Sequence, residues 1–365
     1  MTGRATPITG VRVAVYKFPT PSPESDGTLE WDATVAVTVT LEAGGQSGLG
    51  WTYSSAAAAT VIHDKLASAI HDLDVFDLPR GWAAMHRACR NLGTRGLVMQ
   101  AISAVDIAWW DLRARLLDVG LSEFFGRNRA AVPIYGSGGF CTLTDAELAD
   151  QVRWWRSVGC SAMKIKIGES WGTRPARDLE RVSRLRELAG DEVELMVDAN
   201  GAYSAGQARR IGTALDELGV TWFEEPVSSD DVAGLASVRA ALRCDVAAGE
   251  YAADVYEVER LLPVVDCLQL DVTRCGGYTG WLRCAALAQA RNLEVSAHCA
   301  PSLHAPVAAA IPNLRHVEWF ADHARLEPLL VDGLPEARNG ELQLNADRRG
   351  HGMRLARRAD DFRTS

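Results

Sequence analysis

The feature that most constrains the fold is a strand-like run followed by a helical stretch, repeated along the chain from about residue 126. Stretches with helical periodicity, such as DAELADQVRWWRSVG and SAGQARRIGTALDELG, separate the strand-like runs. Repetition of this kind implies parallel strands with helical crossovers, and eight strands favour a (β/α) barrel over an open sheet. The eight runs are VPIYGSG, AMKIKIG, VELMVDA, TWFEEP, DVAAGE, DCLQLD, LEVSAH and HVEWF.

The N-terminal part of the chain has a different organisation. Residues 11–17 and 33–41 alternate apolar and polar side chains, as half-buried strands do, and residues 18–32 between them read as a loop or a long hairpin tip. Residues 63–117 have helical periodicity, which is clearest in SAVDIAWWDLRARLL. Strands followed by helices predict an α+β unit. A C-terminal tail that contains the strand-like run 340–345 is expected to pack back onto this unit.

Composition excludes several classes of function. The formal net charge is −9, whereas a nucleic-acid binder usually has a basic surface. No apolar run approaches the ~18 residues of a membrane span, and the N-terminal residues lack the apolar core of a signal peptide. The eight cysteines show no CxxC spacing, so reduced thiols in a cytoplasmic protein are expected. The chain is expected to have no nucleic-acid or membrane partner.

Polar residues stand at the ends of the apolar runs. Three of these residues are acidic and follow one another at intervals of 26 positions, which is the length of one strand–helix unit. A barrel brings the C-terminal ends of its strands onto one face, where such enzymes place their active sites. These side chains are therefore expected to converge on one pocket. They are Lys164, Lys166, Asp198, Glu224, Glu250, Asp271, His298 and Glu318.

The three evenly spaced acids, Asp198, Glu224 and Glu250, would form a cluster of carboxylates on adjacent strands. Without a partner they would repel one another and raise their pKa values. A hard divalent cation resolves the conflict, and all-oxygen ligation favours Mg²⁺, with Mn²⁺ as the alternative. Each acid alone is equally compatible with a helix cap or a salt bridge, but the regular spacing of three favours a metal site.

Only four of the 38 basic residues are lysine, and two of these, Lys164 and Lys166, share one face of a strand. If that face is the barrel interior, two cations about 5 Å apart at an effective dielectric of ~20 repel by about 3 kcal/mol, or roughly two pKa units. One lysine would then approach the pKa of a useful base. The alternative is an exposed pair on an edge strand, with Ile165 and Ile167 buried.

His298 and Asp271 end neighbouring strands, so the carboxylate can reach the imidazole. An Asp–His pair fixes the tautomer of the ring and makes a competent acid or base. The alternative interpretation is that His298 is a hydrogen-bonded histidine of the core with no catalytic role. Glu318 ends the last strand, and if it is desolvated near other carboxylates it would stay protonated and donate to a developing oxyanion.

Seven motifs in order carry a resemblance to a known family: MKIKIG, VDANGAYS, WFEEPV, AAGEY, QLDVTRCGGYTGW, VSAHCAP and HVEW. With these the chain resembles the enolase superfamily, specifically its mandelate racemase subgroup. The resemblance implies the α/β class, with an α+β capping domain over a modified (β/α)₇β TIM-type barrel. The implied boundaries are 1–125 for the capping domain, 126–325 for the barrel, and 326–365 for a C-terminal segment that packs back on the capping domain.

The resemblance also implies roles for individual residues. Lys166 and the His298–Asp271 pair would be acid/base groups on opposite faces of the substrate carbon. Lys164 would assist in binding the substrate carboxylate, Glu318 would hydrogen-bond an enediolate, and Asn200 would lie near the substrate. The Mg²⁺ ligands would be Asp198, Glu224 and Glu250. Arg274 stands where muconate-cycloisomerase-like enzymes carry a lysine, so that subgroup is disfavoured.

These roles predict removal of the proton α to a carboxylate, with a divalent metal stabilising the enediolate. Loss of a β-hydroxyl would make the enzyme an acid-sugar dehydratase, a lyase, which is the preferred hypothesis. Reprotonation would make it a racemase or epimerase, and a non-catalytic acid-binding barrel is the third alternative. Trp51 and Tyr53, in a predicted capping loop, are expected to contact the substrate and favour a polyhydroxylated small-molecule acid. A homo-oligomer is expected from the resemblance.

Overall fold

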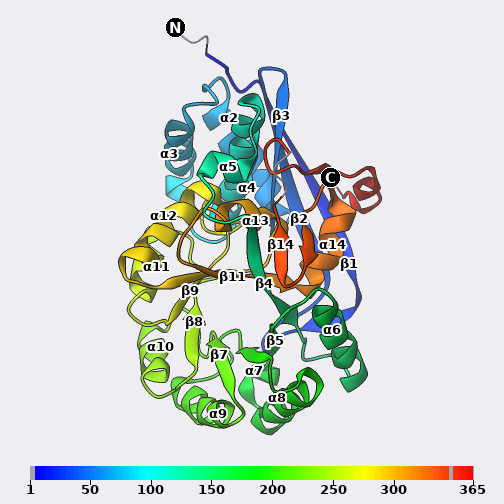
Figure 1. The fold of residues 1–365 in the computed structure, drawn as a ribbon. Coiled ribbons are helices and arrows are strands. Elements are labelled where there is room, and N and C mark those ends of the chain that lie inside the picture. Colours follow the sequence, from blue (N-terminus) through cyan, green and yellow to red (C-terminus); the bar gives the residue numbers. More distant parts are fainter. Residues whose placement is uncertain (1–4, 345–347, 365) are drawn as a thin grey trace.

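The computed structural model describes residues 5–344 and 348–364, and its central feature is a closed barrel of eight parallel strands (Figure 1). Each strand pairs with the next in chain order, and the last pairs with the first to close the ring. The predicted barrel is therefore confirmed. Its strands are β4 (Ala131–Gly138), β5 (Ala162–Lys166), β6 (Glu194–Asp198), β7 (Val220–Glu224), β8 (Asp245–Ala248), β9 (Cys267–Leu270), β10 (Glu294–Ala297) and β11 (Leu314–Phe320).

Helices connect the barrel strands and surround them (Figure 1). The first of them shows why the sequence folds this way: Thr144 and Glu147 form a capping box that fixes the start of α6. Leu148, Val152 and Trp155 then recur at helical spacing and are buried. The helices are α6 (Asp145–Ser157), α7 (Glu169–Gly172), α8 (Pro175–Ala189), α9 (Ala205–Glu217), α10 (Val232–Arg239), α11 (Val255–Leu261), α12 (Gly277–Ala290), α13 (Pro301–Ala308) and α14 (Ala321–Leu330).

The N-terminal unit is a three-stranded antiparallel sheet packed against helices, as predicted. The strands β1 (Gly10–Ser25) and β2 (Glu30–Ala43) run through most of the segment expected as a loop, so only a short turn joins them. Gly50 lets a long helix approach the sheet, because a Cβ there would lie 2.3 Å from the carbonyl oxygen of Ala104. The other elements are β3 (Gln46–Tyr53), α1 (Ala57–Val61), η1 (Ile62–Leu66), α2 (Ala67–Ile70), α3 (Leu78–Ala88), η2 (Arg90–Leu92), α4 (Leu97–Leu116) and α5 (Leu121–Phe125).

The C-terminal segment contacts both units. The run expected to pack on the N-terminal unit instead supplies β14 (Glu341–Gln343), which pairs with β4 of the barrel and with β13 (Glu336–Arg338), because Leu342 is buried there. That detail of the prediction is wrong. The N-terminal unit is reached by η3 (Arg357–Phe362), where the ring of Phe362 lies 4.7 Å from that of Phe18. The remaining strands are β12 (Val331–Asp332) and β15 (Arg354–Leu355), which pair with each other.

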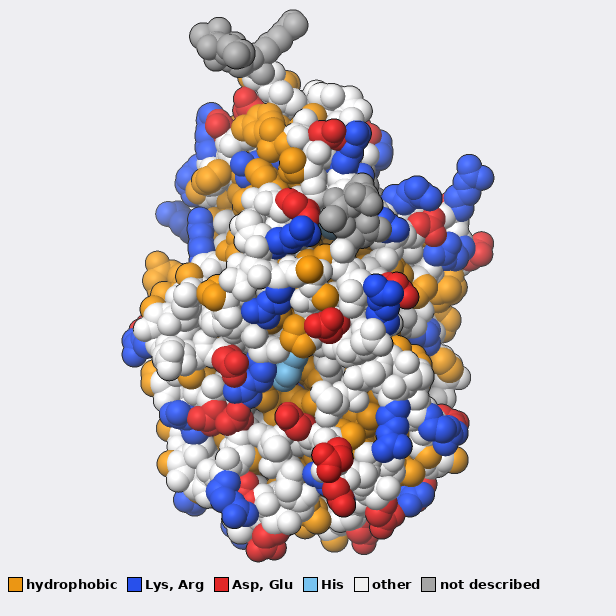
Figure 2. All heavy atoms as spheres, in the orientation of Figure 1, with side chains coloured by type: hydrophobic (Ala, Val, Ile, Leu, Met, Phe, Trp, Pro, Cys, Tyr) orange, Lys and Arg blue, Asp and Glu red, His pale blue; other side chains and the backbone are white. Residues whose placement is uncertain are grey.

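The eight cysteines are all free and buried. Within the described residues, no helix is long and apolar enough to cross a membrane. On the face shown in Figure 2, acidic and basic side chains are interspersed rather than gathered into one basic surface.

The buried carboxylate of Asp111 ties three segments together, so Asp111→Ala is expected to destabilise the protein by about 3–5 kcal/mol. It accepts hydrogen bonds from the backbone of Leu49 (2.9 Å) and His351 (2.8 Å) and pairs with Arg115 (2.7 Å). Removing the carboxylate leaves these hydrogen-bond donors without partners. Urea denaturation would measure the change, with exposed Asp64→Ala as a control that shifts stability by less than about 0.5 kcal/mol. Equal effects of the two variants would contradict this role.

Candidate active site

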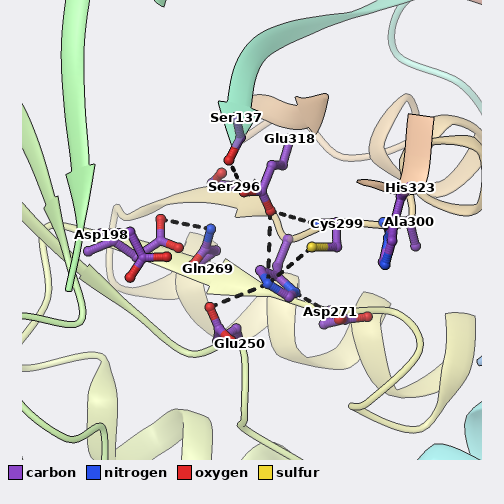
Figure 3. A network of polar contacts seen from close by, with 12 residues as sticks. Ser137, Asp198, Glu250, Gln269, Asp271, Ser296, Cys299, Ala300, Glu318 and His323 are labelled. Carbon is purple, nitrogen blue, oxygen red and sulfur yellow. Dashed lines mark hydrogen bonds and ion pairs between the residues drawn. The ribbon is translucent and has the colours of Figure 1, made fainter. Parts of the chain in front are cut away.

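The predicted polar residues converge at the C-terminal ends of the barrel strands, on the side covered by the N-terminal unit. A cavity of about 270 Å³ lies between the two units. Residues from both line it, including Lys166, His298 and Asn200 from the barrel and Tyr53 and Thr34 from the cap. Figure 3 shows Asp198, Glu250, Asp271 and Glu318 directed toward this common region from different strands.

Asp198, Glu224 and Glu250 form a buried cluster in which one ligand atom of each lies within 4.8 Å of the others. Oε2 of Glu250 is buried and accepts no hydrogen bond, although Nε2 of His298 lies 3.3 Å away. Burial raises the pKa of Glu224 well above its usual value. Three carboxylates that lack full protein compensation are the oxygen donor set that a hard divalent cation prefers. The residues present therefore fit Mg²⁺ or Mn²⁺.

Both lysines point into the barrel and are buried, at 0% exposure for Lys164 and 6% for Lys166, so they are not an exposed edge pair. Nζ of Lys164 lies 2.6 Å from Oε1 of Glu224 and 2.9 Å from Oε1 of Glu318. Lys166 forms an ion pair with Asp198.

The sequence predicted a lowered pKa for one of the two lysines. With the charges of the protein groups alone, this prediction is wrong. Burial opposes the charged form, yet the pKa values of Lys164 and Lys166 are both raised, because Glu224 and Asp198 attract the ammonium groups. The sequence argument counted the repulsion between the two lysines and underestimated the nearer carboxylates.

His298 and Asp271 form the expected pair, with 2.8 Å between Nδ1 and Oδ2. Asp271 is further held by the backbone and hydroxyl of Thr273, both at 2.7 Å, and by Arg274 at 3.3 Å. Burial would raise the pKa of Asp271, but the bond to His298 and the charge of Arg274 lower it. An ionised Asp271 holds the proton of the neutral ring on Nδ1 and leaves Nε2 free to exchange protons.

Glu318 is an ionised acceptor, so the expectation that it stays protonated is wrong. Its carboxylate accepts hydrogen bonds from the hydroxyl of Ser137 (2.6 Å) and the backbone of Cys299 (2.7 Å) (Figure 3). It also pairs with Lys164. Burial alone would raise the pKa of Glu318, but Lys164 lowers it well below the usual value. The sequence argument for Glu318 considered burial and neighbouring carboxylates but not the cation of Lys164. It therefore predicted a protonated carboxyl group.

The three remaining residues expected to contact the substrate do not share one environment: two line the cavity and one does not. Asn200 lines the cavity, and its buried Oδ1 has no hydrogen-bond partner. Tyr53 also lines the cavity, where its ring stacks on His323 at 3.7 Å between centroids. Trp51 is fully buried in the core and is not among the lining residues. The expected substrate contact of Trp51 therefore does not fit the structure, because its side chain packs inside the hydrophobic core.

Sequence reasoning did not assign roles to several other residues that line the cavity. Asp322 and His323 follow the strand motif HVEWF after one alanine. The loops that follow barrel strands carry active-site residues, so their position after the eighth strand was a usable signal. Asp26, in the turn between β1 and β2, gave no comparable signal.

Comparison with protein families gives matches along most of the chain. Residues 8–126 match the mandelate racemase/muconate lactonizing enzyme N-terminal domain. Residues 147–359 match the enolase C-terminal domain-like family. The two matches follow each other in the order of the capping unit and the barrel.

Comparison with individual proteins gives similar results. A 3,6-anhydro-alpha-L-galactonate cycloisomerase of Streptomyces coelicolor is 33% identical over 95% of this chain and 97% of its own. The L-talarate/galactarate dehydratase of Salmonella typhimurium is 32% identical over 86% of this chain and 79% of its own. Its structure with Mg and L-lyxarohydroxamate has a TM-score of 0.91 at 28% identity, covering 99% and 94% of the two chains.

A crystal structure of a mandelate racemase/muconate lactonizing enzyme-like protein from Rubrobacter xylanophilus is also similar. Its TM-score is 0.94 at 42% identity, and the match covers 98% of this chain and 99% of that one. Domain matches, relatives and solved structures thus agree with one another on the family. The chain belongs to the mandelate racemase/muconate lactonizing enzyme family of the enolase superfamily.

Proposed function

We propose that this protein is a Mg²⁺-dependent enzyme that removes the proton α to the carboxylate of a sugar acid and then expels the oxygen on the β-carbon. Dehydration to a 2-keto-3-deoxy acid is the reaction that the site supports best. The observation that carries this proposal is the arrangement around one cavity. Two proton-transfer groups, Lys166 on β5 and His298 after β10, line the same cavity beside a cluster of three buried carboxylates.

Asp198, Glu224 and Glu250 would hold the metal ion. When bound, Mg²⁺ supplies positive charge that lowers the free energy of an enediolate. Lys164, held between Glu224 and Glu318, adds a fixed ammonium group to the same region.

The two proton-transfer groups divide the chemistry between them. One of Lys166 and His298 takes the α-proton, and the other donates a proton to the departing β-oxygen. Asp271 keeps the His298 ring oriented for either task through its bond to Nδ1.

The relatives support an elimination. The name of the Streptomyces coelicolor relative places an ether oxygen on C3 of a C1 carboxylic acid, which is the β-carbon. Ring opening there and loss of a β-hydroxyl from galactarate as water both follow removal of the C2 proton. A cycloisomerase and a dehydratase therefore need the same groups and differ in the oxygen that leaves.

Racemisation or epimerisation is the second candidate function. The same pair of groups favours it, because a proton removed by one and returned by the other inverts the α-carbon. The choice depends on whether the β-oxygen leaves before the proton returns. The polar lining of the cavity, with Thr34, Ser54, Asn200 and His323, favours a polyhydroxylated acid that has such a leaving group.

Incubating a panel of sugar acids with the enzyme and Mg²⁺ in D₂O tests the proposal. We expect at least one acid to give a 2-keto acid that reacts with semicarbazide, since elimination at C3 produces an enol that becomes a ketone. α-Deuteration without a 2-keto acid would instead assign the racemase or epimerase function. Tight binding of acids with neither product would contradict both and support a non-catalytic barrel.

The proposed setting is the cytoplasm, as a homo-oligomer without nucleic-acid or membrane partners. The eight buried free thiols are typical of a reducing compartment. The net charge of −9 disfavours nucleic acid. Analytical ultracentrifugation would test the oligomeric state.

A further inference from the structure

His323, near the start of α14, presents a polar atom to the cavity that no catalytic role uses. Its ring lines the cavity and is stacked on Tyr53. In Figure 3, His323 lies beyond Cys299, on the side opposite Asp198 and Glu250. It therefore faces a part of the cavity away from the carboxylates that would hold the metal.

The hydrogen bonds of His323 fix its tautomer. The backbone N–H of Ala300 donates to Nδ1 at 2.9 Å, so Nδ1 carries no proton. The proton of a neutral ring must then be on Nε2. No described residue accepts a hydrogen bond from Nε2, and Nε2 is not among the fully buried atoms that lack a partner. The ring stays neutral near pH 7, because burial lowers the pKa of His323 to about 4. Nε2 is thus a neutral donor that faces the cavity.

The charges around this part of the cavity are unfavourable to a second carboxylate. Asp322, next to His323 at the start of α14, and Asp26, in the turn between β1 and β2, are the aspartates of the lining outside the residues assigned above. Asp322 pairs with Arg325 and accepts a hydrogen bond from Thr34. Asp26 accepts hydrogen bonds only from its own turn, at Thr28 and Leu29.

The positively charged side chains that line the cavity lie beside the carboxylates of the proposed catalytic site. Among the described residues that line the cavity, the lysine and arginine side chains are Lys166 and Arg274. Lys166 pairs with Asp198, and Arg274 lies 3.0 Å from Glu250 and 3.3 Å from Asp271. A carboxylate beside His323 would therefore meet the neutral Nε2 donor and the carboxylate of Asp322, which Arg325 already pairs, with no cation of the lining left to pair with it.

Resting on the proposed function, we infer that the site takes a sugar acid with one carboxylate, an aldonate or anhydroaldonate, and rejects aldarates. His323 is the specificity-determining residue: its Nε2–H donates to a hydroxyl at the end of the substrate remote from the carboxylate. A hydroxyl accepts this bond without bringing charge near Asp322.

Matched substrate pairs test the charge argument with the unmodified enzyme. Each D-hexonate is compared with the hexarate of the same configuration at C2 to C5, so only the group at C6 differs. We expect the preferred hexonate to have a kcat/KM about 100-fold above that of its hexarate, since an unpaired like charge costs several kcal/mol. Equal or better turnover of hexarates would overturn the inference. Absence of both 2-keto acid and α-deuteration with every acid would instead overturn the proposed function.

His323→Phe tests the donor, because it keeps an aromatic ring against Tyr53 and removes the N–H. We expect KM for the preferred hexonate to rise about tenfold with kcat little changed, as for a bond made equally in the ground and transition states. His323→Gln keeps a neutral N–H donor and is expected to recover part of the loss. His63→Phe, at an exposed histidine, is the matched control.

Two results would contradict the role of His323. An unchanged KM in His323→Phe would show that Nε2 does not contact the substrate. A fall in kcat with an altered pH profile would place His323 in proton transfer instead. Circular dichroism and Mg²⁺ titration of each variant separate these results from misfolding.

Discussion

Lys166→Met and His298→Asn are each expected to lower the rate of β-elimination by about 10²–10⁴-fold, the usual contribution of a general acid or base. The two variants should differ in α-deuterium exchange. The one that lacks the base loses exchange, because the α-proton is no longer removed. The one that lacks the acid retains exchange, because proton removal does not depend on protonation of the leaving oxygen. Mass spectrometry of the recovered substrate from D₂O measures this difference and identifies the base.

Lys65→Met is a matched control, since Lys65 is an exposed lysine of the N-terminal unit. It should retain both elimination and exchange. If Lys166→Met and His298→Asn both kept near-normal elimination, the assignment of the two proton-transfer groups would be wrong.

Glu250→Gln is expected to weaken Mg²⁺ binding by at least about 100-fold and to lower kcat by about 10³-fold. Glu250 is one of three clustered carboxylates, and its Oε2 accepts no hydrogen bond from the protein. Isothermal titration calorimetry with MgCl₂ measures the affinity. Treatment with EDTA should abolish turnover of the unmodified enzyme, and added Mg²⁺ should restore it.

Asp106→Asn provides the control for this charge change, because Asp106 is an equally buried carboxylate in the N-terminal unit. It should leave Mg²⁺ affinity unchanged. Turnover that persists after exhaustive EDTA treatment, or the same affinity in Glu250→Gln, would contradict the metal site.

The barrel and its site were predictable because both depend on periodic patterns in the chain. Apolar runs set the strands, and strand ends must meet on one face of a closed barrel. The 26-residue spacing of Asp198, Glu224 and Glu250 therefore brought them together in space. The pairing of His298 with Asp271 follows in the same way from adjacent strands.

Protonation states were not predictable, because they depend on which charges are nearest in three dimensions. Lys164 lies between Glu224 and Glu318. These two ion pairs raise the pKa of the lysine, and the ammonium group lowers the pKa of Glu318. Trp51 shows a second limit. It lies on the same strand as Tyr53 and two positions away, but only Tyr53 reaches the cavity, because the depth at which a strand enters the core is set by packing.

The most direct test of the metal site is anomalous diffraction from crystals grown with Mn²⁺. We expect one strong Mn²⁺ peak within about 2.3 Å of carboxylate oxygens from Asp198, Glu224 and Glu250. It should lie in the cavity lined by Lys166 and His298. A peak at other residues, or no peak at saturating Mn²⁺, would contradict the existence of this centre.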